Sequence, residues 1–199
     1  MTHSVQLLIG KDPAIGRFLN RWKVARTVEL AGGWLVVPME EKLYTAIEAA
    51  SPGTTRPAQL DLSPLGLEEA MIAATHDGGA LVYIETDYWG GTGGQSAMAV
   101  ADGLVTRQPE RSRGAGGPVN SALRAIGVTR QGDKDEFDTI GLGERRTMED
   151  YEPEGPRRLR AGPANPAPEA DPKSTLPGWV VILLVALFVG AGIAIAQFR

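Results

Sequence analysis

The sequence centres on Tyr83-Ile84-Glu85-Thr86-Asp87-Tyr88-Trp89-Gly90-Gly91-Thr92-Gly93-Gly94-Gln95-Ser96. The residues before the glycines continue an apolar run from Ala80, and residues 95–100 form a second strand-like run. Glycine permits the positive φ angles that turns require, so the two runs predict strands joined by a wide, glycine-rich hairpin connection. The stretch therefore indicates an antiparallel sheet.

Two carboxylates are expected on one face of the first strand, because successive side chains alternate between the faces of a sheet. Glu85 and Asp87 would lie about 5.5–7 Å apart. This separation suits a hard cation or an acid and base pair, although a solvent-exposed strand face is the simpler interpretation. Trp89 is either an exposed contact residue or folds back over the sheet. The candidate binding residues are Glu85, Asp87, Trp89, Gly90, Gly91, Gly93 and Gly94.

The glycines do not match a known phosphate-binding motif. A P-loop requires a lysine that is missing here, and Ser96 occupies the position of the third glycine in a dinucleotide-binding fingerprint. A catalytic triad is also poorly supported, because the chain has no cysteine, no Gly-x-Ser-x-Gly motif and two histidines. We assign no catalytic residue, no metal ligand and no cofactor.

The surrounding pattern predicts an α+β domain over residues 1–143, with an antiparallel sheet and about three helices. Helical spacing of apolar residues occurs in 40–50, 63–74 and 118–126, and a weaker pattern occurs in 13–22. The expected strands are 5–9, 24–30, 34–37, 80–87, 95–100 and 104–106.

Residues 144–177 are expected to form a disordered tether. Half of the 14 prolines fall in this segment, and proline removes amide donors and favours an extended chain.

A transmembrane helix is predicted at 178–198. Trp179 to Ala196 contains no charged residue, and a helix of this length spans roughly 27 to 30 Å, the thickness of the hydrocarbon core. Basic residues lie mainly on its N-terminal side, so the positive-inside rule places the N-terminal domain in the cytoplasm. The chain is thus expected to be a single-pass, tail-anchored protein of the cell membrane.

Small residues recur every four positions along one face of this helix, at Ala186, Gly190 and Ala194. This spacing allows two helices to approach closely and indicates a possible homodimer. Alternatively, these residues simply face lipid.

The net charge of -4 and the absence of a basic cluster in the predicted domain argue against nucleic acid as a partner. A protein partner is expected instead.

The segments Tyr83–Ala97 and Asn120–Leu142 resemble a pattern found in small bacterial proteins of uncharacterised function. The shared segment has the form Tyr-Ile-Glu-x-Asp-Tyr-x-Gly-Gly-x-Gly-x-Gln, and the resemblance covers residues 5–143. It implies a folded domain, and it implies no activity, cofactor or catalytic residue.

The sequence as a whole predicts a membrane-anchored binding or interaction domain more than an enzyme. One alternative is an immunity-type inhibitor that captures a toxin through an acidic face around Glu85, Asp87 and Asp135 to Asp138. Another is a small cation-dependent hydrolase centred on Glu85, Asp87 and His76.

Overall fold

The computed structural model describes residues 3–113 and 116–152. Its centre is a six-stranded antiparallel sheet with the strand order β2-β3-β1-β4-β5-β6. The strands are β1 (His3–Gly10), β2 (Val28–Glu29), β3 (Leu35–Pro38), β4 (Ala80–Trp89), β5 (Thr92–Ala101) and β6 (Leu104–Arg113).

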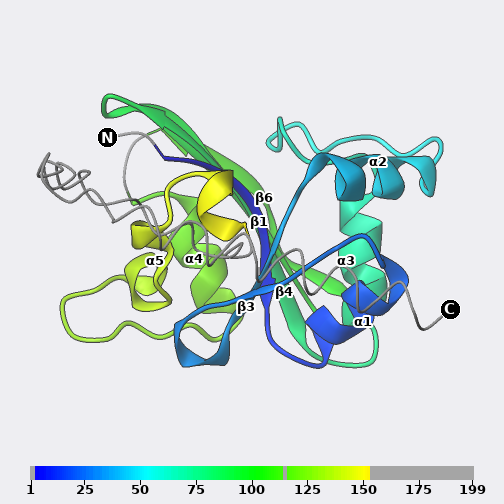
Figure 1. Ribbon diagram of the computed structural model, residues 1–199, viewed down its shortest axis with the longest axis horizontal. Coiled ribbons are helices and arrows are strands. Elements are labelled where there is room, and N and C mark those ends of the chain that lie inside the picture. The colour runs from blue at the N-terminus through cyan, green and yellow to red at the C-terminus, as the bar shows by residue number, and fades with distance from the viewer. Residues whose placement is uncertain (1–2, 114–115, 153–199) are drawn as a thin grey trace, which may run out of the picture. The chain divides into compact units, whose positions relative to one another are not determined.

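Helices cover both faces of the sheet, which Figure 1 shows edge-on. On one side lie α1 (Ala14–Arg21), α2 (Glu41–Ala49) and α3 (Leu67–Thr75); on the other lie α4 (Pro118–Ala125) and α5 (Glu136–Thr139). Short 3-10 helices occur at η1 (Ala31–Gly33), η2 (Leu142–Glu144) and η3 (Met148–Tyr151).

Two hydrophobic cores result, one on each face. Tyr83 and Met98 pack into the core beneath α1, α2 and α3, whereas Val82 and Ile84 belong to the core beneath α4. Because side chains alternate along a strand, one strand can serve both cores only if both of its faces are apolar. β4 meets this condition, with residues 81–86 all buried. The expected α+β class with an antiparallel sheet is therefore confirmed.

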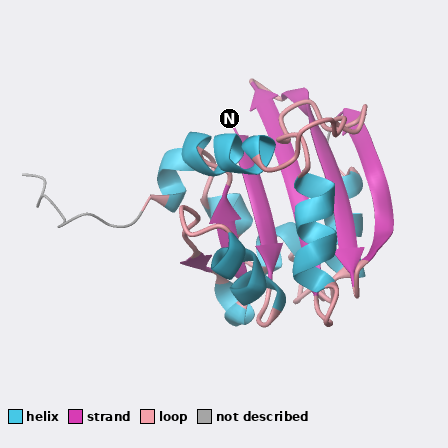
Figure 2. Cartoon of the chain, turned by 90° about the vertical axis from the view of Figure 1, so that its right-hand side faces the viewer, coloured by secondary structure: helices cyan, strands magenta, loops and turns pink. Residues whose placement is uncertain are grey.

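Two strands differ most in length from the prediction. The expected strand at 24–30 reduces to β2, because a turn precedes it in which the amide of Ala25 donates to the carbonyl of Trp22. Arg26 in the same segment forms an ion pair with Glu40 and donates to the backbone carbonyl of Tyr151. The expected strand at 104–106 continues to Arg113 as β6, the outer strand of the sheet. Figure 2 views the sheet from the side of α1, α2 and α3, and its long edge strand stands clear of the helices in front.

The folded part continues beyond residue 143, where the sequence predicted a tether. Residues 142–144 and 148–151 form η2 and η3, and the side chain of Tyr151 is fully buried. The domain boundary at 143 is thus corrected, because this segment returns to the sheet. Its Thr147 forms a parallel bridge with Ser4 of β1.

The remainder of the predicted tether and the predicted transmembrane helix at 178–198, with Ala186, Gly190 and Ala194, lie outside the described residues. Within residues 3–113 and 116–152, no helix is long and apolar enough to cross a bilayer.

Candidate functional site: the β4–β5 hairpin

The glycines of the central stretch are explained by the hairpin backbone. β4 and β5 pair as far as Trp89 and Thr92, so the connection is only Gly90-Gly91, tighter than the wide loop expected. Both glycines have positive φ angles, as a type I′ turn requires. A Cβ atom on Gly93 would lie 2.0 Å from the backbone oxygen of Asp87. The hairpin backbone therefore accounts for these glycines whether or not a ligand binds, and only Gly93 excludes a Cβ atom by close contact.

Glu85 lies on the same face as Asp87 but is not exposed to solvent, since only 4% of its surface is accessible. Its carboxylate accepts hydrogen bonds from the backbone amides of Asp61 (3.1 Å) and Leu62 (2.9 Å), and from the Tyr83 hydroxyl (3.1 Å). Burial raises the pKa of Glu85, and these three donors act in the opposite direction. The carboxylate therefore anchors a loop to the centre of the sheet.

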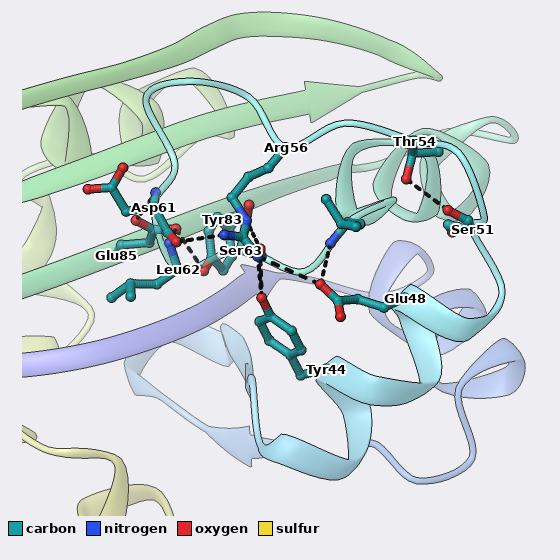
Figure 3. Close-up of polar contacts among 11 residues, drawn as sticks. Tyr44, Glu48, Ser51, Thr54, Arg56, Asp61, Leu62, Ser63, Tyr83 and Glu85 are labelled. Atoms are coloured by element: carbon teal, nitrogen blue, oxygen red, sulfur yellow. Dashed lines mark hydrogen bonds and ion pairs between the residues drawn. The ribbon is translucent and has the colours of Figure 1, made fainter.

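That loop, residues 51–66, is also held by Arg56 (Figure 3). The Arg56 guanidinium donates to the backbone carbonyls of Ser63 and Asp61, and to the hydroxyl of Tyr44 on α2. It also lies 3.7 Å from the Glu48 carboxylate. The loop thus meets α2 at one end and β4 at the other. Sequence reasoning missed this network, because its members are far apart in the chain and form no motif.

Beyond Glu85 the same face of the sheet is open. Asp87 is exposed, and Trp89 at the end of β4 has 70% of its surface accessible. Trp89 therefore does not fold back over the sheet. We call the surface formed by Asp61, Leu62, Asp87, Trp89, Arg111 and Arg113 the hairpin surface.

A cavity of about 400 Å³ lies within the hairpin surface, lined by the loop and by β4, β5 and β6. In the part of the chain that the structure describes, no helix residue contributes to its lining. Arg111 crosses its rim to pair with Asp61, and both side chains are about half exposed. Gly94 at its floor carries no side chain, and a Cβ atom there would approach the Ser112 carbonyl oxygen to 3.3 Å. The cavity thus has acidic and basic groups at its margin.

The proposed grouping of Glu85, Asp87 and His76 is not formed. His76 follows α3 with its side chain 79% exposed and paired to Asp77. Because a strand rises about 3.3 Å per residue, Glu85 lies roughly 17 Å along β4 from the end that His76 approaches. In the described part of the chain, no cluster of three or more His, Asp or Glu side chains is placed to hold a metal ion.

The acidic residues do not form one continuous face either. Glu85 and Asp87 lie on the side of α1, α2 and α3, whereas Asp135 precedes α5 on the other side of the sheet. Asp135 caps α5 by accepting from the amide of Asp138 at 2.9 Å. A single partner could therefore contact both acidic groups only by binding opposite faces of the sheet at once.

Comparison of the chain with protein-family models, curated proteins and solved structures returned no match. The hairpin surface and the fold must therefore carry the functional argument.

Proposed function

We propose that residues 3–152 form a binding module that captures a protein partner through the hairpin surface. The exposure of Trp89 carries this proposal. The side chain of Trp89 lies at the end of a strand and is 70% accessible, so most of its apolar surface remains in contact with water. Exposed large aromatic side chains are common anchors of protein interfaces, where a partner buries them.

The neighbours of Trp89 support the same reading. Leu62, also on the hairpin surface, is 39% exposed, and Arg111 and Arg113 extend from β6, which pairs with β5. Tryptophan and arginine are enriched at interface hot spots, and a rim of charged groups gives specificity more than affinity. The surface combines an aromatic anchor with a rim of both charge signs, which suits a folded protein partner with a mixed surface.

We further propose that the hydrophobic segment 178–198 holds this module at the membrane, with residues 153–177 contributing the connection. The proposal rests on the amino-acid pattern of these segments. Such an arrangement would present the hairpin surface to partners at or near the cytoplasmic side of the membrane.

The test uses the full-length chain purified from membranes of the source cell, with Trp89→Ala as the variant. Leu104→Ala is a matched control, because Leu104 is also 70% exposed and begins β6 at the far end of the sheet. We expect a stoichiometric protein to copurify with the unchanged chain and with Leu104→Ala, and to be lost with Trp89→Ala.

The copurified protein is then titrated against each variant. An anchor residue costs about 2 kcal/mol or more when truncated, so Trp89→Ala should weaken the affinity about 30-fold. Retention of the same protein by Trp89→Ala, or a loss that is equal for Leu104→Ala, would remove the hairpin surface from the interaction.

A further inference from the structure

A second cavity, on the opposite face of the sheet, has a different chemistry. It measures about 340 Å³ and lies between the sheet, the start of α4 and α5. Its ring-bearing lining residues are His3, Tyr88 and Phe137, from β1, β4 and α5. We call this cavity the ring pocket. Its volume is within the range of small-ligand sites, which are mostly apolar with a few placed polar groups.

Among the described residues, one acidic side chain, that of Asp135, lines the ring pocket, and no Lys or Arg does so. Burial lowers the pKa of His3, so its imidazole is neutral at neutral pH. Arg146 and Asp150 act on His3 with opposite signs, and neither residue lines the pocket.

The Asp135 carboxylate retains acceptor capacity. Its Oδ1 accepts from the amide of Asp138 and its Oδ2 from the side chain of Asn120, both at 2.9 Å. A carboxylate offers about four acceptor positions, so roughly half remain. Among the described residues, Asp135 has no ion-pair partner. A half-buried carboxylate without a cation favours a ligand that supplies one.

The aromatic lining favours a flat cation. The rings of His3 and Phe137 contact each other with centroids 5.3 Å apart and an angle of 59° between their planes. Aromatic faces attract cations, and planar delocalised cations combine stacking with paired hydrogen bonds to a carboxylate.

We propose that the ring pocket binds a flat organic cation, an amidinium or guanidinium group, with Asp135 as its counter-ion. The site is separate from the hairpin surface and does not depend on the function proposed above. The cation is either part of a free small molecule or the side chain of an arginine in a peptide.

The test titrates the full-length chain with benzamidine, benzamide and benzoate, which share one ring and differ in charge. Binding is followed by saturation-transfer NMR and calorimetry. We expect benzamidine to bind about tenfold more tightly than benzamide, as a charge-assisted hydrogen bond predicts, and benzoate not to bind. Equal affinity for all three compounds, or no binding of benzamidine, would overturn the proposal.

Two variants locate the site. Asp135→Asn removes the charge and keeps an oxygen that can cap α5. The affinity of this variant for benzamidine should therefore fall to that for benzamide. Asp133→Asn is the matched control, since Asp133 is exposed and does not line the pocket. If both variants lose affinity equally, the preference reflects general charge and the assignment to Asp135 is wrong.

Phe137→Leu tests the aromatic lining and leaves the charge of the pocket in place. This substitution should weaken the affinity for benzamidine several-fold, and an unchanged affinity would show that the rings are not used.

Nα-acetylarginine amide distinguishes the two sources of the cation. Tighter binding than benzamidine assigns the site to an arginine side chain, and weaker binding assigns it to a free aromatic cation.

Discussion

The backbone amide of Leu62 donates to the carboxylate of Glu85 across 2.9 Å, which joins the loop 51–66 to the middle of the sheet. Asp61 donates to the other oxygen of the same carboxylate. One side chain of β4 thus positions two residues of the hairpin surface.

Replacement of Glu85 should therefore loosen this loop. Glu85→Ala leaves the amides of Asp61 and Leu62 without their acceptor, and we expect a loss of about 1–3 kcal/mol in the free energy of unfolding. Faster hydrogen exchange at these two amides should accompany the loss. Asp87→Ala is the control, because Asp87 is exposed on the same strand and should change stability by no more than about 0.5 kcal/mol. Equal effects of the two variants would contradict the anchoring role.

The ionisation of Glu85 should also make stability depend on pH. Burial raises its folded-state pKa above the ordinary value of 4.5, so the folded protein binds this proton more tightly than the unfolded chain does. The resulting contribution is fully present below pH 4.5 and is lost as pH rises through the raised pKa. Glu85→Gln removes it. The stability of the unchanged chain relative to Glu85→Gln should fall as pH increases from 4.5, as measured by urea denaturation from pH 4 to 8. A difference that is constant with pH would show that the pKa is not raised.

Glycine is required at one position of the hairpin and replaceable at another. Gly93→Ala would place its Cβ atom 2.0 Å from the backbone oxygen of Asp87, and relief requires opening the strand pairing. We expect a cost of about 2–3 kcal/mol in thermal denaturation. Gly90→Asn should change stability by no more than about 0.5 kcal/mol, because Asn-Gly favours this turn and no atom lies within 4 Å of a Cβ there. A larger cost for Gly90→Asn than for Gly93→Ala would contradict the hairpin geometry.

The segment after residue 143 should contribute to stability. The side chain of Tyr151 is fully buried, so Tyr151→Ala should lower the free energy of unfolding by about 3–5 kcal/mol, as for other large aromatic residues. The neighbouring Glu152 is exposed, and Glu152→Ala serves as the control with little expected effect. Chemical denaturation measures both. A negligible effect of Tyr151→Ala would restore the tether boundary near residue 143.

The hairpin could be predicted because its signals are local. Alternation along β4 and the paired glycines Gly90 and Gly91 need no distant partner to be recognised. The burial of Glu85 could not be predicted, since the groups that bind its carboxylate are the backbone amides of Asp61 and Leu62. Almost every residue has a backbone amide, so no sequence pattern identifies these two as partners. The exposure of Trp89 could not be predicted either, because it depends on whether a distant segment of the chain covers that face of the sheet.

The outer strand and the end of the domain were underestimated for a different physical reason. β6 beyond Thr106 contains Arg107, Pro109 and Arg111, a composition that protects an edge strand from aggregation but is also typical of a loop. Tyr151 is one aromatic residue in a charged segment, and its contacts with the domain include Arg26, which is 125 positions earlier.

The return of residues 147–151 to β1 determines how the domain bears mechanical load. Ser4 donates its amide to Arg146, and Arg26 holds the carbonyl of Tyr151. A pull on the chain beyond residue 152 is therefore resisted first by these two hydrogen bonds and the buried tyrosine ring. Through Ser4 the force then passes to β1, which lies between β3 and β4 in the interior of the sheet, and through Arg26 it passes to the segment between α1 and β2. Tension at the C-terminal end thus reaches a central strand, paired on both sides, before it reaches the edge strand β6, which contributes Arg111 and Arg113 to the hairpin surface.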